Sequence, residues 1–179
     1  MILAIGGPPG SGKTTVAERI AKETGSTLVS AGTRFRALAE ERGMTLEAFG
    51  RFASDHEDVD RELDRQVVEE VVRLAADGKK VVVEGRLAAQ MLARRGVDCL
   101  KVWIDAPAAV RAERIAGRDG TTVTGARRAI AERERLERAR YKRFYGIDLR
   151  DTSGFDLVIN SGDRTPADIV ADVLPRVAG

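Results

Sequence analysis

The stretch "GGPPGSGKTT", residues 6–15, places glycines, two prolines and a lysine side by side. Before it, "MILAI" (1–5) is a short apolar run of the kind that forms a buried parallel strand. After it, "VAERIAK" (16–22) has apolar residues at helical spacing. The stretch is therefore a strand-to-helix turn, and within it the pattern G-x-x-x-x-G-K-[ST] predicts a phosphate-binding loop.

Each residue type in this loop suits contact with phosphate. Glycines let backbone N–H groups converge on phosphate oxygens, and the positive end of the following helix dipole points to the same place. Lys13 can reach the β- and γ-phosphates, the Thr14 hydroxyl can ligate Mg²⁺, and two prolines stiffen the loop. The residues expected to hold a nucleoside triphosphate are Gly7, Pro8, Pro9, Gly10, Ser11, Gly12, Lys13, Thr14 and Thr15.

Strand-like and helical patterns alternate along the rest of the chain. The strand-like runs are residues 2–6, 27–31, 80–85, 100–106 and 155–160. The helical patterns are 13–24, 34–43, 45–54, 60–78, 86–96, 106–117 and about 125–144, with a last helix whose N-cap is Thr165 and whose first residue is Pro166. This alternation predicts a single α/β domain with a five-stranded parallel sheet covered by helices on both faces.

Two intervals break the alternation. Residues 32–78 place several helices, where one would suffice, between the second and third strands. Residues 118–125, "RDGTTVTG", read as a polar loop bracketed by Gly117, Gly120 and Gly125. Insertions around a phosphate loop are typical of a substrate clamp and a lid, so we expect 118–125 to be mobile without ligand and ordered when the site is filled.

The composition restricts the class of protein. Of 179 residues, 43% are hydrophobic and 32% charged, which suits one soluble domain. No apolar run is long enough to span a membrane and no secretory leader is visible, so we expect a cytoplasmic protein. A net charge of +2 argues against a nucleic-acid binder. A single cysteine excludes an intrachain disulfide; Cys99 is expected in the core and the single histidine, His56, on the surface.

The third strand-like run ends in Glu84, Gly85 and Arg86. Because parallel sheets bind ligands at the carboxyl ends of their strands, these residues are expected beside the phosphate loop. There Glu84 can organise Mg²⁺ through water and Arg86 can hold an acceptor phosphate; the alternative is a strand-end salt bridge. Asp105, which ends the fourth run, competes with Glu84 for the metal or caps the next helix. We favour Glu84.

Residues 111–150 hold eleven arginines and one lysine against six acids. Arg114 and Arg118 share one helix face, and Arg133 and Arg140 lie two turns apart on another. Arginines stabilise the negative charge that spreads over a transferring phosphoryl group. The alternative, which stays open for some of them, is pairing with acids of the same helix. Those acids are Glu132, Glu134 and Glu137.

Residues 40–64 have the opposite balance, nine acids against three arginines. Asp60 and Asp64 are four residues apart on a predicted helix of this insertion. A carboxylate accepts well from an exocyclic amino group such as that of cytosine, so these two aspartates are candidates for reading an acceptor base. The alternative is an acidic helix face in contact with solvent.

Taken together, several segments resemble the archaeal-type cytidylate kinases over nearly the whole chain. These segments are "GPPGSGKTTVAERIA", "LVSAGTRFRALAEERGM", "DRELDR", "VVVEGRLA", "APAAVRAERIA", "ER…RARYKRFYGID" and "DLVIN". The resemblance implies a P-loop kinase that transfers the γ-phosphoryl group of ATP to CMP or dCMP with Mg²⁺. It also implies a core (1–31, 79–117, 145–179), a monophosphate-binding insertion (32–78) and a short lid region (118–144).

The resemblance also assigns roles to residues. Ser30, Gly32, Phe35 and Arg36 would belong to the monophosphate site, with Arg36 and Arg86 gripping its phosphate. Arg114 would lie against the donor adenine, and the transferring phosphoryl would be approached by Arg118, Arg133 and Arg140. We expect small-molecule nucleotides as the partners of a monomeric enzyme. The alternatives are a kinase of the same build for AMP or a small alcohol, and a nucleotide switch or ATPase, although the guanine-reading N-K-x-D of switch GTPases is absent.

Overall fold

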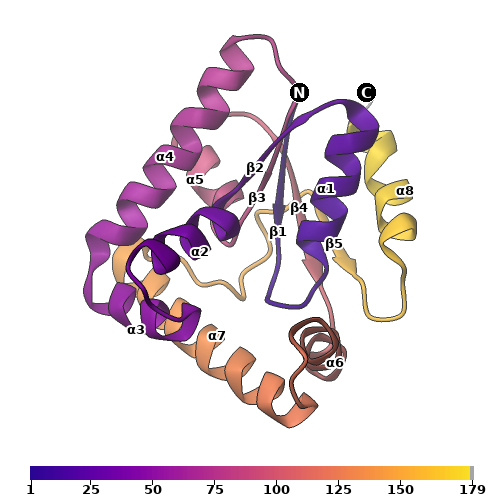
Figure 1. The fold of residues 1–179 in the computed structure, drawn as a ribbon. Helices are drawn as coiled ribbons and strands as arrows, with labels where there is room; N and C mark the ends of the chain where they lie inside the picture. Colours follow the sequence, from indigo (N-terminus) through magenta and orange to yellow (C-terminus); the bar gives the residue numbers. More distant parts are fainter. Residues whose placement is uncertain (178–179) are drawn as a thin grey trace.

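In the computed structural model, which describes residues 1–177, five strands form one parallel sheet with helices on both faces (Figure 1). The strand order is β2-β3-β1-β4-β5. The strands are β1 (Ile2–Gly6), β2 (Thr27–Ser30), β3 (Val81–Glu84), β4 (Leu100–Asp105) and β5 (Leu157–Asn160). The helices are α1 (Lys13–Thr24), α2 (Ala31–Glu41), α3 (Leu46–Asp55), α4 (Glu57–Ala76), α5 (Ala88–Arg94), α6 (Ala108–Asp119), α7 (Val123–Tyr145) and α8 (Pro166–Val177). The predicted α/β fold is confirmed.

The central strand β1 is buried on both faces because successive side chains point to opposite sides of the sheet. Leu3 and Ile5 join a core with residues of α1 and α8, whereas Ala4 joins a second core with residues of α4 and α5. At its carboxyl end, Ile5 is in register with Glu84 of β3 and Gly6 with Trp103 of β4. The chain after β1 therefore lies between the ends of β3 and β4.

The insertion between β2 and β3 consists of α2, α3 and α4, which have a small core of their own. Phe49 of α3 is completely buried there, with the Phe35 ring 4.7 Å away and tilted by 51°. The strand β2 ends at Ser30 because this residue caps α2: its Oγ accepts from the Thr33 N–H at 3.0 Å. His56 is exposed at the α3–α4 junction, as expected, and its ring stacks on Phe52.

The predicted polar loop 118–125 is wrong in extent. Helix α6 continues through Gly117 to Asp119, and Gly120 caps it in a left-handed conformation (φ 62°) with its N–H donating to the Ala116 carbonyl. Thr122 then caps α7, with its Oγ1 accepting from the Gly125 N–H at 3.1 Å. A Cβ added to Gly117 would have no neighbour within 4 Å. Glycine at this position therefore neither breaks the helix nor allows a close approach of another segment. Only residues 120–122 separate the two helices.

Candidate active site

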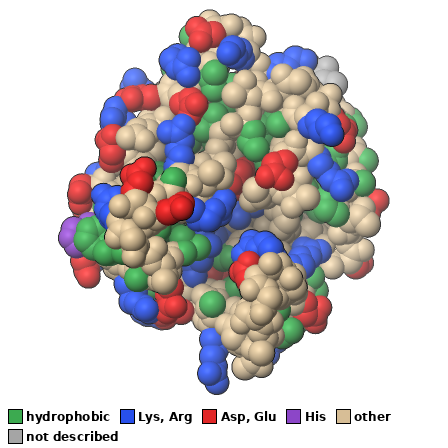
Figure 2. All heavy atoms as spheres, viewed as in Figure 1, with side chains coloured by type: hydrophobic (Ala, Val, Ile, Leu, Met, Phe, Trp, Pro, Cys, Tyr) green, Lys and Arg blue, Asp and Glu red, His purple; other side chains and the backbone are tan. Residues whose placement is uncertain are grey.

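A cavity of about 360 Å³, called here the main cavity, lies at the carboxyl edge of the sheet. In Figure 2, Lys and Arg side chains gather around the hollow at the centre of the view. The predicted site residues that line it are Pro9, Gly10, Ser11, Gly12, Lys13, Thr14, Thr15, Gly32, Phe35, Arg36, Asp64, Glu84, Gly85, Arg86, Arg114, Arg118, Arg133 and Arg140. Those that do not are Gly7, Pro8, Ser30 and Asp60. Most of the site residues predicted from the sequence therefore line one cavity.

The loop between β1 and α1 requires glycine because other backbone segments approach it closely and because its backbone takes a left-handed conformation. A Cβ on Gly7 would lie 2.2 Å from the Ile104 carbonyl oxygen, and one on Gly10 would lie 2.7 Å from that of Arg111. Gly12 has φ 86° and begins α1 with no side-chain cap. Because the first N–H groups of a helix have no partner within it, this helix start is suited to bind an anion.

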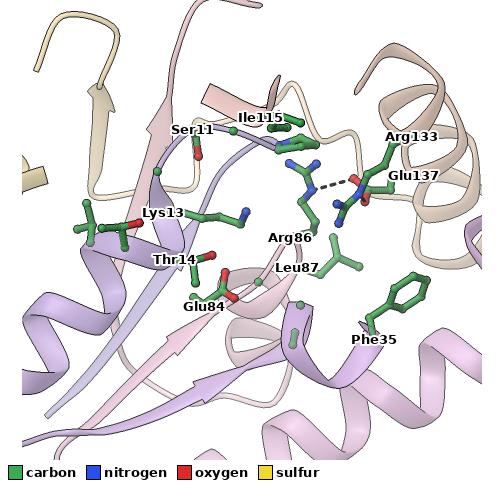
Figure 3. Close-up of a pocket in the computed structure, with 18 of the residues that line it drawn as sticks. Ser11, Lys13, Thr14, Phe35, Glu84, Arg86, Leu87, Ile115, Arg133 and Glu137 are labelled. Atoms are coloured by element: carbon green, nitrogen blue, oxygen red, sulfur yellow. Dashed lines mark hydrogen bonds and ion pairs between the residues drawn. The ribbon is translucent and has the colours of Figure 1, made fainter. Parts of the chain in front are cut away.

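Lys13, Thr14 and Glu84 face one another across the floor of the main cavity (Figure 3). Burial, followed by the positive charge of Arg86, lowers the pKa of Lys13 to about 8, while Glu84 opposes the shift. Glu84 is 2% exposed, and its Oε1 accepts from the Ser30 hydroxyl at 2.5 Å. Ser30 thus orients a carboxylate of the site without lining the cavity itself.

Asp105 does not share this position. Its side chain accepts from the Ala106 N–H at 2.7 Å and lines a separate cavity of about 240 Å³. The N-cap of α6 is Pro107, so the alternative of Asp105 as a helix cap is wrong. Of the two carboxylates, Glu84 alone lies in the main cavity with Thr14.

Arg86 and Arg133 reach the main cavity from β3 and α7, and one carboxylate binds both. The Glu137 Oε2 lies 2.7 Å from the Arg86 Nε, and its Oε1 accepts from the Arg133 Nε at 2.7 Å. The Arg86 Nη1 also donates to the Gly7 carbonyl at 2.5 Å. Burial would raise the pKa of Glu137, but Arg86 and Arg133 outweigh it and lower the pKa to about 2.

Arg114 and Arg118 line the same side of the cavity but differ in their contacts. Arg114 donates to the Ser161 hydroxyl at 2.9 Å and to its carbonyl at 2.6 Å, so it is fixed against the loop after β5. Arg118 is mostly exposed and pairs with the adjacent Asp119 at 2.6 Å. Arg118 is therefore free to change partners, whereas Arg114 is held.

Arg140 lies in an environment that the sequence did not indicate. Its Nε is 2.7 Å from the Asp60 Oδ2, and both side chains are 2% exposed. Its guanidinium lies 5.4 Å from the Phe35 ring centroid and 5.0 Å from that of Tyr141, and its Nη1 donates to the Gly50 carbonyl at 3.2 Å. Most of this guanidinium is thus engaged in joining α7 to the insertion.

The two aspartates proposed to read the base, Asp60 and Asp64, differ in their position relative to the main cavity. Asp60 faces Arg140 and does not line the main cavity, whereas Asp64 does. The Asp64 Oδ2 accepts from the Tyr145 hydroxyl at 2.7 Å. Burial raises the pKa of Asp64 to about 6, although this hydrogen bond opposes the shift. Helical spacing placed both aspartates on one helix face, but it could not show that Asp60 forms an ion pair with Arg140.

Several residues of the cavity were not singled out from the sequence as site residues. They are Val16, Ala31, Leu63, Leu87, Ile115, Glu137, Tyr141, Ser161, Arg164, Pro166 and Ile169. Glu137 had a signal, since it lies four residues after Arg133, but it was read only as a neutralising partner. Ser161 and Arg164, in the connection between β5 and α8, match no sequence motif. They reach the cavity because β5 lies next to β4 at the edge of the sheet, and the sequence does not give this strand order.

The parallel sheet, the phosphate loop and the cavity lined by basic side chains define a phosphotransferase of the P-loop kinase class. A model of the cytidylate kinase-like family matches residues 2–163, and the chain belongs to this family. Cytidylate kinase of Pyrococcus horikoshii is 44% identical over 173 residues, 97% of this chain and 86% of that protein. Cytidylate kinase of Methanopyrus kandleri is 48% identical over 168 residues, 90% of this chain and 84% of that protein.

Solved structures agree on the fold. An uncharacterized protein from Eubacterium ventriosum has a TM-score of 0.72 at 18% identity, covering 100% of this chain and 99% of that chain. Shikimate kinase from Acinetobacter baumannii in complex with shikimate has a TM-score of 0.61 at 16% identity, covering 99% and 92%. At these identities the likeness concerns the fold alone. No helix in the described part of the chain is long and apolar enough to cross a membrane.

Proposed function

We propose that this chain is a cytidylate kinase that transfers the γ-phosphoryl group of ATP to CMP or dCMP, giving ADP and CDP or dCDP. One observation carries the proposal: the phosphate loop and a helical insertion open onto the same cavity, and basic residues line the space between them. Curated relatives named cytidylate kinase, at 44% and 48% identity, support this acceptor.

The donor half of the proposed site is the phosphate loop with Lys13, Thr14 and Thr15. The triphosphate lies against the start of α1, and Arg114 lies along the adenine. Lys13 stabilises the charge that develops on the transferring phosphoryl group. Arg118 and Arg133 approach it from α6 and α7. Arg140, held by Asp60, acts on the phosphoryl group at longer range than Arg118 and Arg133.

The acceptor half of the proposed site lies against α2 and α4. Arg36 and Arg86 hold the CMP phosphate, and Phe35 packs on the base. Gly85 lets the chain after β3 pack against α2, because an added Cβ would lie 2.8 Å from the Ala31 Cβ, and Gly32 lies beside Glu84. Asp64 accepts a hydrogen bond from the cytosine amino group.

The residues present also fit a magnesium ion. Among residues 1–177 there is no group of three or more acidic, histidine or cysteine side chains that could enclose a metal. Mg²⁺ in kinases is held mostly by substrate phosphates and waters with one or two protein oxygens. Thr14 and Glu84 supply such oxygens in the main cavity, and bound Mg²⁺ would neutralise part of the phosphate charge.

An acceptor panel tests the proposal directly. ATP and magnesium are incubated with CMP, dCMP, UMP, AMP, GMP or no acceptor, and ADP and the diphosphate product are quantified. We expect ADP to form rapidly only with CMP or dCMP. Fast ADP release without acceptor would indicate an ATPase, and preference for AMP would indicate the alternative acceptor. Either result would overturn the proposal. The comparisons give those alternatives no support.

Because both halves of the site come from one chain, we further propose that the enzyme acts as a monomer, in the cytoplasm where its nucleotides occur. Sedimentation across a range of protein concentrations tests the first point. A mass that doubles within the range where activity is measured would contradict it.

A further inference from the structure

Glu137 is an acidic residue in the wall of a cavity proposed to bind phosphates. It is 5% exposed and lines the main cavity from α7. An unpaired carboxylate there would repel a nucleotide, because like charges at close range destabilise one another strongly in a partly buried site. Its presence therefore requires a role that outweighs this repulsion.

The contacts of Glu137 show a specific pattern. Each of its oxygens lies 2.7 Å from the Nε of a different arginine, Arg86 on one side and Arg133 on the other (Figure 3). The Arg133 contact is a hydrogen bond, whereas the Arg86 contact is an ion pair in which Arg86 Nε and Glu137 Oε2 have no hydrogen-bond partner among the described residues. Arg86 Nη1 donates to the Gly7 carbonyl, and Arg86 Nη2 is buried without a partner in the same part of the chain. The contacts with Glu137 thus leave Arg86 Nη2 and the terminal nitrogens of Arg133 for phosphate oxygens.

The same contacts join three elements of the site. Arg86 follows β3 and donates to the Gly7 carbonyl of the phosphate loop, while Arg133 and Glu137 belong to α7. Glu137 therefore links α7 to the loop through Arg86, beside a second link in which Arg111 contacts Glu134 of α7 and the Pro9 carbonyl. Without the Glu137 charge, Arg86 and Arg133 would lose the carboxylate that lies between them.

We propose that Glu137 is a positioning residue that holds Arg86 and Arg133 by their Nε atoms, so that Arg86 Nη2 and the terminal nitrogens of Arg133 face one phosphoryl group. The inference rests on the proposed kinase function and goes beyond it. Glu137 does not bind the nucleotide; it sets the distance between two cations that do. A phosphoryl group between them would then be bound from β3 and from α7 at once.

The test compares Glu137→Gln with Glu132→Gln. Glutamine keeps the size of the side chain but removes its charge, and it can accept at one Nε only. Glu132 lies on the same helix, pairs with the exposed Arg135 and does not line the main cavity. We expect kcat/KM for CMP to fall by about 10- to 100-fold in Glu137→Gln, in the range of losing one preorganised charge contact, and by less than about 2-fold in Glu132→Gln.

A split between the two substrates separates positioning from a merely structural role. Loss of the Glu137 charge should lower kcat/KM for CMP in Glu137→Gln while the KM for ATP, which the phosphate loop holds, stays within about 2-fold of the wild type. A merely structural role would weaken the use of both nucleotides alike. Glu137→Asp, which keeps the charge on a shorter side chain, should recover part of the lost kcat/KM, and it also serves if Glu137→Gln does not fold.

The outcomes are distinct. Wild-type kcat/KM for CMP in folded Glu137→Gln would overturn the inference, as would equal losses for CMP and ATP. If the wild-type protein phosphorylates neither CMP nor dCMP, the proposed function fails instead. A loss of kcat/KM for CMP in Glu137→Gln with a near-normal KM for ATP, together with partial recovery in Glu137→Asp, supports the inference.

Discussion

At the scale of single residues, Lys13 is where burial and a neighbouring positive charge act in the same direction. Burial in the cavity wall and the nearby Arg86 lower its pKa to about 8. The lysine is therefore protonated at neutral pH but begins to lose its charge at only mildly alkaline pH. Bound phosphates add negative charge beside it and must shift the same equilibrium back toward the protonated form.

Replacing Lys13 by alanine should reduce kcat by about 100-fold or more, because a preorganised positive charge is lost at the transferring phosphoryl group. Circular dichroism should show an unchanged fold. In the wild type, kcat/KM for ATP should fall as pH rises through about 8, and the limb of kcat should lie at higher pH because the substrate complex holds the proton. A folded Lys13→Ala variant with near-normal turnover would contradict the site assignment.

Asp64 provides a second residue-level prediction. Asp64→Asn should raise KM for CMP by about 10-fold or more, since a buried hydrogen bond to a charged acceptor is lost, and should improve the use of UMP relative to CMP. Burial raises the pKa of Asp64 to about 6, so the wild-type KM for CMP should rise as pH falls through 6. The mutant should lack this rise. Asp58→Asn, exposed on the same helix, is the matched control.

The sequence could predict residues that act within one motif but not those that act through distant partners. The phosphate loop and Glu84 follow from a local pattern and from the rule that parallel strands present their carboxyl ends to ligands. The pairing of Asp60 with Arg140 joins residues eighty positions apart, and helical spacing alone gave both of them a role in binding. Tertiary contacts of this kind leave no local pattern.

At the scale of elements, the turn between α6 and α7 is shorter than the sequence indicated. The sequence pattern predicts that this helix ends at Gly117. In the structure, Gly120 is the C-cap of α6 and Thr122, two residues later, is the N-cap of α7. Element type and order were predictable because apolar periodicity is strong, whereas a glycine in an exposed helix gives no local sign that the helix continues. The division into core, insertion and lid stays a prediction.

Hydrogen exchange tests the lid. A bisubstrate analogue that links cytidine and adenosine through phosphates should slow exchange in residues 118–125 markedly, and ATP alone should slow it less. The reason is that Arg118, now paired with the exposed Asp119, can exchange that partner for a phosphate when both halves of the site are filled. Strand β4 is the internal control. Equal exchange with and without the analogue would mean that this segment does not close.

At the scale of the whole molecule, α7 contacts both the insertion and the residues beside the phosphate loop. Toward its carboxyl end, Arg140 pairs with Asp60 and Tyr145 donates to Asp64, both of α4. In its middle, Glu137 binds Arg86 beside the phosphate loop. One continuous helix thus contacts the insertion directly and the phosphate loop through Arg86 (Figure 1).

Breaking the Asp60–Arg140 pair should destabilise the protein more than breaking any surface pair. Asp60→Asn leaves a buried guanidinium without its counter-charge, and we expect the free energy of unfolding in urea to fall by about 3 kcal/mol. Glu47→Gln, which breaks an exposed pair with Arg51, should cost less than about 1 kcal/mol. Similar losses for both variants would show that the buried pair contributes no more than the surface one.

The continuity of α7 has a thermodynamic consequence. If ATP shifts this helix toward one arrangement by drawing Arg133 to its phosphates, the same shift reaches the acceptor side through Arg140. Linkage then requires reciprocity: whatever factor ATP applies to the affinity for CMP, CMP must apply equally to the affinity for ATP. The two nucleotides, which meet only at the transferred phosphoryl group, would thus bind cooperatively, with helix α7 coupling the two binding events.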